Sequence, residues 1–210
     1  MRYLLPDFNI YPVISQNFCR NGSAVQTLYE LIEGGIKIVQ LREKERPKKH
    51  VFDLAEQFRK ITAKAGVTLI INDYLDIALD IKADGVHLGQ RDFPCHAARK
   101  VAPDMIIGVS THNLDQALRA EQNGASYINI GPIFPTRTKI TGIDPLGPNI
   151  ISTIAAKIKI PFTVMGGIKK HHIPQLLEAG AKQIAMVTEL TQAEDIPGKV
   201  RELQAMFNER

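Results

Sequence analysis

The chain has 210 residues, of which 44% are hydrophobic, enough for one ordinary buried core. Its formal charge of +4 arises from 26 basic and 22 acidic residues, and no nucleic-acid-reading motif accompanies this mild excess. We therefore expect no nucleic-acid partner, and an anionic small molecule matches the charge better. The two cysteines, Cys19 and Cys95, are far apart in sequence and lack the short spacing of paired zinc-binding cysteines. This argues against a zinc site or a disulfide.

The sequence shows neither a signal-peptide pattern nor an apolar run long enough to cross a membrane. We therefore expect a cytoplasmic protein without a membrane partner. The sequence leaves the oligomeric state open, including a homo-oligomer.

Residues 10–14 form the first predicted strand, after an N-terminal extension, residues 1–9, for which the sequence predicts no structure. A predicted helix over residues 23–33 ends at Gly34-Gly35, and a strand over residues 36–39 follows. A glycine just past a helix can take the left-handed conformation that ends it. The same helix, glycine, strand pattern therefore predicts joints at Gly66, Gly85, Gly124 and Gly180.

Eight strands are predicted, separated by segments of helix size. They are continuously apolar, as expected when both faces of a parallel sheet are covered. Their ends fall near Ile14, Gln40, Ile71, Leu88, Val109, Ile130, Met165 and Val187. This pattern predicts an α/β protein, with residues 1–210 forming a single (β/α)₈ barrel domain. An open doubly wound sheet is the alternative, but no Gly-x-Gly-x-x-Gly fingerprint opens an early helix.

In such a barrel the carboxyl ends of all the strands meet at one mouth, where active sites are built. The residues expected there are Gln40, Arg42, Lys44, Asn72, Asp73, Gln90, Asp92, Ser110, His112, Thr136, Thr138, Lys139, Gly166, Gly167, Thr188 and Glu189. Asp73 and Asp92 are single carboxylates on neighbouring units, a set that suits Mg²⁺ better than zinc.

Three cations at the mouth, Arg42, Lys44 and Lys139, predict a highly anionic ligand such as a diphosphate. A second anion site is predicted at Gly167 and the backbone of residues 187–188, because the ends of strands seven and eight are the usual phosphate site of a barrel. Two phosphorylated ligands in one mouth indicate a group transfer.

The motifs at these strand ends resemble those of the thiamine phosphate synthase family. They are found at residues 40–44, 71–73, 85–92, 108–112, 131–139 and 166–168, and the resemblance runs in order from Tyr11 to Asp195. It implies an Mg²⁺-dependent transferase that joins a hydroxymethylpyrimidine diphosphate to a thiazole phosphate, giving thiamine phosphate and pyrophosphate.

The resemblance also implies a role for each site residue. The pyrimidine diphosphate is expected to bind Gln40, Arg42, Lys44, Asn72, Ser110 and Lys139. The metal ligands are expected to be Asp73 and Asp92. The thiazole phosphate is expected to bind Thr136, Arg137, Thr138, Gly167, Val187 and Thr188. Among these, the residues expected to be catalytic are Arg42, Lys44, Lys139 and Ser110.

The sequence departs from the family after strand eight, where Thr188 and Glu189 stand in place of small residues. A working phosphate site requires the Glu189 side chain to turn away. Two other functions stay open: a thiazole tautomerase of the same barrel family, with His112 in proton transfer, and a non-catalytic binder of phosphorylated metabolites.

Single residues also have structural explanations. Asp73 could be a helix N-cap, Gly166-Gly167 could be a tight joint, and His87 is expected to be a packed core histidine.

Overall fold

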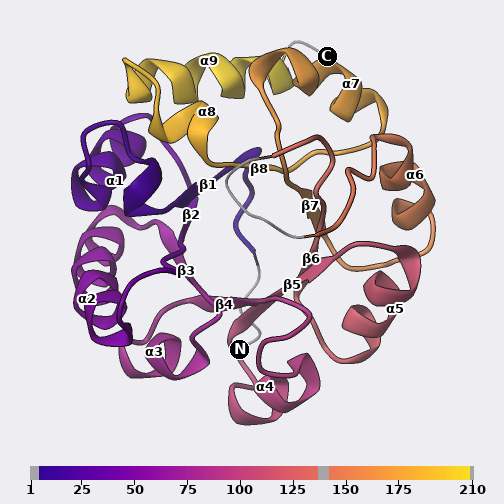
Figure 1. Ribbon diagram of the computed structural model, residues 1–210, viewed down its shortest axis with the longest axis horizontal. Helices are drawn as coiled ribbons and strands as arrows, with labels where there is room; N and C mark the ends of the chain where they lie inside the picture. Colours follow the sequence, from indigo (N-terminus) through magenta and orange to yellow (C-terminus); the bar gives the residue numbers. More distant parts are fainter. Residues whose placement is uncertain (1–4, 137–141, 209–210) are drawn as a thin grey trace.

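The computed structural model describes residues 5–136 and 142–208. Eight parallel strands pair in sequence order and close into a barrel, which confirms the predicted fold (Figure 1). The strands are β1 (Ile10–Ile14), β2 (Ile38–Leu41), β3 (Thr68–Asn72), β4 (Gly85–Leu88), β5 (Ile106–Thr111), β6 (Tyr127–Ile130), β7 (Phe162–Val164) and β8 (Ile184–Met186).

Helices surround the barrel as an outer ring (Figure 1). The α-helices are α1 (Ala24–Glu33), α2 (Lys48–Ala65), α3 (Leu75–Asp80), α4 (Cys95–Val101), α5 (Leu114–Gln122), α6 (Asn149–Ala155), α7 (Ile173–Glu178), α8 (Thr188–Thr191) and α9 (Ile196–Asn208). Two short 3₁₀ helices, η1 (Gln16–Phe18) and η2 (Lys170–His172), follow β1 and β7. Within residues 5–136 and 142–208, no helix is long and apolar enough to span a membrane.

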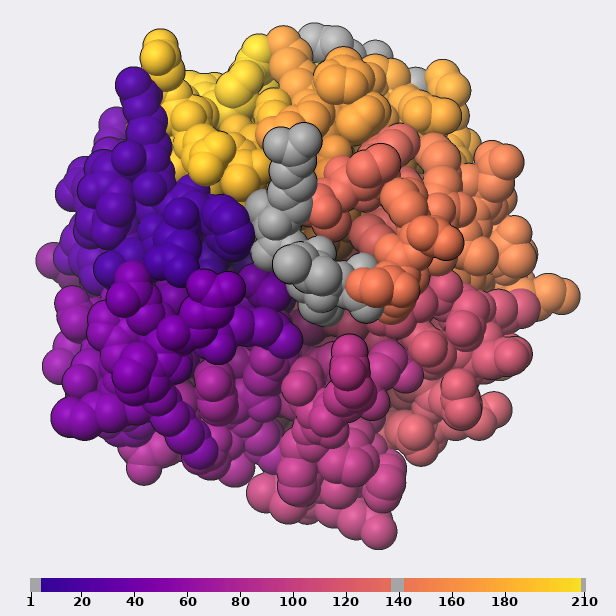
Figure 2. Space-filling view, viewed as in Figure 1, coloured from indigo at the N-terminus to yellow at the C-terminus, as the bar shows by residue number. Residues whose placement is uncertain are grey.

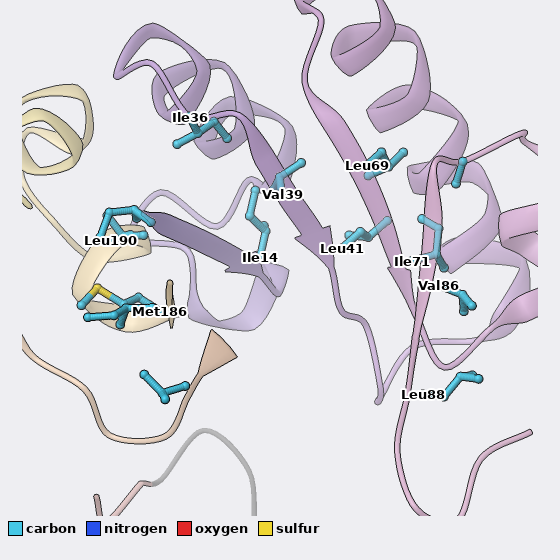
Figure 3. Close-up of a cluster of buried hydrophobic side chains, with 14 of the residues drawn as sticks. Ile14, Ile36, Val39, Leu41, Leu69, Ile71, Val86, Leu88, Met186 and Leu190 are labelled. Atoms are coloured by element: carbon cyan, nitrogen blue, oxygen red, sulfur yellow. The ribbon is translucent and has the colours of Figure 1, made fainter. Parts of the chain in front are cut away.

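Alternate residues of each strand pack into two different hydrophobic clusters. One cluster lies between the strands and the helices, and includes Ile14, Leu41 and Ile71 (Figure 3). The other fills the barrel interior, with Ile38 and Ile70 among its members. Because the side-chain period of a strand is two, Gln40 and Asn72 lie on the same inward face as these isoleucines. This alternation carries polar side chains from the ends of the strands into the mouth.

Residues 5–9 pack against the other end of the barrel. Phe8 is buried in the interior cluster and packs edge-to-face on Tyr11, with ring centroids 5.7 Å apart. The Asn9 carbonyl accepts a hydrogen bond of 2.8 Å from the Ile184 N–H. Residues 5–9, for which the sequence predicted no structure, therefore extend the interior packing below β1.

Helix ends follow the expected local chemistry. The Ser23 hydroxyl caps α1 by accepting from the Gln26 N–H at 3.2 Å. Positive φ angles are found at Gly66, Gly124 and Gly180, which confirms these three helix-to-strand joints.

The joint predicted at Gly85 is wrong. Gly85 is the first residue of β4, and the chain leaves α3 through Lys82, whose φ is +54°. A Cβ at Gly85 would lie 2.6 Å from the Ile106 carbonyl oxygen and 2.6 Å from Ile70 Cδ1. The glycine is needed because strands β3, β4 and β5 pack closely at this point, and not because the backbone requires a left-handed conformation.

Candidate active site

The loops after the strands meet at one face of the barrel. Figure 2 shows this face, where segments from all parts of the sequence gather around the centre. The strands end within two residues of their predicted ends, so the polar residues that follow them arrive at this mouth as expected.

Asp73 lies in the turn between β3 and α3 and points towards the loop after β2. Its φ of +65° places a non-glycine residue in the left-handed region, and its N–H donates to the His87 carbonyl at 2.8 Å. The Asp73 carboxylate lies 2.9 Å from Lys44 Nζ. Tyr74 is the N-cap residue of α3 and no side chain caps this helix. The helix-cap explanation of Asp73 therefore does not hold, and the turn directs its carboxylate into the mouth.

The Asp92 side chain, from the loop after β4, lies beside that of Asp73. Burial raises the pKa of Asp73, the Asp92 contact raises it further, and Lys44 opposes both effects. Asp92 Oδ2 also accepts from the Gly89 N–H at 2.6 Å. A Cβ at Gly89 would lie 2.7 Å from the same oxygen, so a side chain at this position would displace the Asp92 carboxylate. The chain thus holds two carboxylates close together, which costs free energy when both are charged. A bound cation would remove this cost.

Arg42 adds a second cation on the same side of the mouth. It is half-buried, and burial lowers the pKa of its guanidinium while Asp73, Glu43 and Glu45 raise it. The Ser15 hydroxyl donates to the Arg42 carbonyl at 2.6 Å and so fixes the backbone after β2. Arg42 and Lys44 therefore place two positive charges in the region around Asp73.

Three more predicted residues face the mouth from inward positions on the strands. Asn72 is buried, and its Nδ2 is an unpartnered donor within the described part of the chain. Such a group costs free energy until an acceptor meets it, which favours a ligand at this position. Gln40 is 2% exposed and donates to Tyr11, whereas Ser110 is half-buried and contacts His87.

The two loops predicted to bind phosphate pack directly on each other. The N–H groups of Ile133 and Phe134 donate to the carbonyls of Met165 and Gly166, both at 2.9 Å. Gly167 has a φ of +61°, and a Cβ there would collide with the Pro135 carbonyl and lie 2.9 Å from that of Phe134. The glycine pair therefore makes room for the loop after β6, a packing role that the sequence did not reveal.

A cavity of about 40 Å³ lies between these loops and the end of β8. Among the residues that line it are Thr136, Gly167, Lys169, Val187 and Thr188. Four of them were predicted to share one phosphate site, and the structure brings all four together. Lys169 was not predicted. Its Nζ lies 3.4 Å from the Thr188 hydroxyl, so it adds a cation at the cavity.

Glu189 turns towards the segment that follows β7. Its carboxylate lies 3.3 Å from Lys169 Nζ and accepts from the Lys170 N–H at 3.3 Å. The side chain is 15% exposed. The charge that departs from the family pattern is therefore matched by a lysine beside it.

Three predicted site residues, Arg137, Thr138 and Lys139, lie outside the described residues. His112, the proton-transfer group of the tautomerase alternative, donates from Nδ1 to the Gly131 carbonyl at 2.5 Å. This bond ties the end of β5 to the loop after β6.

The chain matches the sequence model of one protein family over residues 10–190, and that family is described as thiamine monophosphate synthase. The chain belongs to the thiamine phosphate synthase family. The thiamine-phosphate synthase of Pelotomaculum thermopropionicum is 44% identical over 207 residues, which cover 98% of this chain and 95% of the relative. That of Shouchella clausii is 42% identical over 203 residues, covering 96% and 97%.

Solved structures agree with this family assignment. The thiamine phosphate pyrophosphorylase of Pyrococcus furiosus superposes with a TM-score of 0.87 at 31% identity and covers 96% of both chains. A 3-hexulose-6-phosphate synthase superposes with a TM-score of 0.69 at 17% identity, covering 94% of this chain and 99% of its own, and shows the fold alone. The two relatives named above are synthases, so these matches give no support to the tautomerase or to the non-catalytic binder.

Sequence reasoning missed two further residues: Tyr11, which accepts a hydrogen bond from Gln40, and Tyr127, whose hydroxyl contacts that of Tyr11. Both are fully buried in the barrel interior and carry hydroxyl groups on the inward face of their strands. The alternation of side chains along each strand could have indicated them. Tyr11 faces the same side of β1 as Val13, and Tyr127 faces the same side of β6 as Asn129. His87 is a buried histidine as expected, but it also contacts Ser110.

Proposed function

We propose that this transferase joins 4-amino-2-methyl-5-(diphosphooxymethyl)pyrimidine to a thiazole phosphate, forming thiamine phosphate and pyrophosphate. The observation that carries the proposal is a pair of positively charged regions in one mouth. Lys44 and Arg42 form the first, beside Asp73, and the cavity at Gly167 and Thr188 forms the second. A reaction between two phosphorylated substrates requires both sites at once.

The first site suits the departure of pyrophosphate. The bond between the pyrimidine methylene and the diphosphate oxygen breaks, and its electron pair leaves with pyrophosphate. The aminopyrimidine ring stabilises the cation that remains, and the lone pair of the thiazole nitrogen then forms the new carbon–nitrogen bond. Arg42, Lys44 and Lys139 stabilise the negative charge that develops on the leaving group.

The second site holds the nucleophile in place. A phosphate in the cavity would receive positive charge from Lys169 and a hydroxyl contact from Thr188. Anchoring the phosphate end keeps the thiazole nitrogen near the reacting carbon, which lowers the entropic part of the barrier. No side chain needs to act as a nucleophile.

Asp73 and Asp92 fit the binding of Mg²⁺. The two carboxylates are in contact, and burial with this neighbour raises the pKa of Asp73, so a divalent cation would stabilise both in their charged forms. No group of three or more His, Cys, Asp or Glu side chains gathers among residues 5–136 and 142–208. A bound Mg²⁺ would therefore take its remaining oxygen ligands from water or phosphate. When bound, it would neutralise charge on the leaving pyrophosphate.

Turnover with both substrates tests the proposal. The purified protein is mixed with the pyrimidine diphosphate and the thiazole phosphate, with Mg²⁺ or with a chelator, and thiamine phosphate is measured by chromatography. We expect product only with Mg²⁺ and both substrates. Product in chelator would overturn the metal assignment, and isomerised thiazole phosphate without product would point to a tautomerase.

A further inference from the structure

Five polar side chains form a continuous chain of hydrogen bonds across the barrel interior. Gln40 Nε2 donates to the Tyr11 hydroxyl at 2.9 Å, and the Tyr11 and Tyr127 hydroxyls lie 3.0 Å apart. His87 Nδ1 lies 3.0 Å from the Tyr127 hydroxyl, and His87 Nε2 lies 2.9 Å from Ser110 Oγ. The two ends of the chain, Gln40 and Ser110, are the residues assigned to the pyrimidine.

The interior is shaped to hold this chain. Tyr11 and Tyr127 are fully buried and Gln40 is 2% exposed, so water does not compete for the hydrogen bonds that the two tyrosines form. Gly108, within β5, is where a Cβ would collide with the Tyr127 ring. The glycine therefore lets that ring reach the centre of the barrel, where Tyr11 and His87 meet it.

The donor at one end sets the direction of every bond. Burial raises the pKa of both tyrosines, so each keeps its one hydroxyl proton. Tyr11 accepts from Gln40, and Tyr127 is the one acceptor that the described residues offer to the Tyr11 hydroxyl. Tyr11 must therefore donate to Tyr127, because a buried donor without an acceptor is costly.

The remaining bonds follow from this one. Tyr127 donates to His87 Nδ1, which must be the unprotonated nitrogen. His87 then donates from Nε2 to Ser110 Oγ. The Ser110 hydroxyl proton is left to donate into the mouth, and the Gln40 amide presents its oxygen at the end opposite Tyr11.

We propose that Tyr11, Tyr127 and His87 are positioning residues that make Ser110 a hydrogen-bond donor and Gln40 an acceptor towards the substrate ring. This inference rests on the proposed function. An aminopyrimidine matches the arrangement, because its exocyclic amine donates and its ring nitrogens accept. A 4-oxo analogue accepts at its exocyclic oxygen and carries a proton on the neighbouring ring nitrogen, so it reverses both roles at that edge and is rejected. The chain of hydrogen bonds therefore sets substrate specificity from within the barrel.

The tautomer of His87 gives a test that does not depend on activity. The protein is labelled with ¹⁵N-histidine, and the His87 signals are assigned among the six histidines by comparison with His87→Gln. We expect a protonated Nε2 and a bare Nδ1. A protonated Nδ1 with a bare Nε2 would overturn the proposed direction. Tyr127→Phe removes the donor to Nδ1 and should increase the fraction protonated at Nδ1.

Kinetics test the link to specificity. Tyr127→Phe and Tyr11→Phe each break the chain while keeping the ring, and should lower kcat/KM for the pyrimidine diphosphate about tenfold, the effect of one lost buried hydrogen bond. The KM for thiazole phosphate should change less than about threefold. Thr163→Val is the matched control. It removes a buried hydrogen bond of 2.8 Å to the Asn129 side chain, which is not one of the five hydrogen-bonded side chains. Its kcat/KM should stay within about threefold of the unmodified protein.

Binding of the 4-oxo analogue distinguishes a failure of the positioning role from a failure of the proposed function. It should bind the unmodified protein at least about tenfold more weakly than the amino substrate, and Tyr127→Phe should narrow that ratio. Equal binding of the two ligands, or an unchanged ratio in Tyr127→Phe, would overturn the positioning role. Turnover of the natural substrates with the opposite His87 tautomer would overturn this inference alone. The expected tautomer without any turnover would overturn the proposed function alone.

Discussion

Gly167→Ala should destabilise the fold and weaken the thiazole-phosphate site together. An alanine at φ +61° costs about 1 kcal/mol, since left-handed strain of about 1–2 kcal/mol is partly offset in the unfolded chain. The added Cβ would also collide with the Pro135 carbonyl, and overpacking of this kind costs about 1–3 kcal/mol more. The total is about 2–4 kcal/mol, or roughly 6–12 °C in Tm for a chain of this size.

Gly66→Ala is the matched control for this prediction. Gly66 has a φ of +66° and no heavy atom within 4 Å of its added Cβ, so it reports the backbone strain alone, about 1 kcal/mol or about 3 °C. The chain has no tryptophan, so unfolding is followed by circular dichroism in urea and by heating. The KM for thiazole phosphate should rise about tenfold in Gly167→Ala alone, because the displaced loop carries Thr136. Equal destabilisation by the two substitutions would refute the packing argument.

Three further substitutions test single residues of the site. Asp92→Ala should abolish most activity at limiting Mg²⁺ while the circular dichroism spectrum stays native, because the side chain lies at the mouth; full activity in a Mg²⁺ titration would remove Asp92 from the metal site. Lys139→Ala should lower kcat more than it raises the KM for thiazole phosphate, because its charge acts on the departing pyrophosphate. A defect in that KM alone would assign Lys139 to the other substrate. Glu189→Ala should change the thiazole-phosphate KM less than about threefold, under 1 kcal/mol, because the carboxylate contacts Lys169 and Lys170. A large fall in KM would mean that Glu189 obstructs the cavity.

The barrel could be predicted because its signals are local. Apolar runs, amphipathic helices and glycines at helix ends repeat along the chain, and each is visible within one βα unit. Gly85 shows the limit of this reasoning. Its helix-to-strand position suggested a left-handed joint, whereas the structure requires glycine because Ile70 and Ile106 from neighbouring strands leave no space for a Cβ. Such contacts between strands are absent from the local pattern.

The site also has residues that could be predicted from the sequence and contacts that could not. Asp73, Asp92 and Gly167 could be located because they follow strands whose ends all meet at one mouth. The hydrogen bond between Tyr11 and Tyr127 could not be predicted, since it joins residues 116 positions apart through the barrel interior. Lys169 was missed for a similar reason, because the cavity that it lines becomes evident only when the loops after β6, β7 and β8 are packed together.

Release of pyrophosphate with each substrate combination tests the central claim most directly. The protein with Mg²⁺ is given the pyrimidine diphosphate alone, the thiazole phosphate alone, or both, and pyrophosphate and thiamine phosphate are measured in the same samples. We predict that the two products appear in a one-to-one ratio when both substrates are present. Pyrophosphate release at the same rate without thiazole phosphate, or no thiamine phosphate with both substrates, would contradict the claim that the protein joins two phosphorylated substrates at the mouth of its barrel.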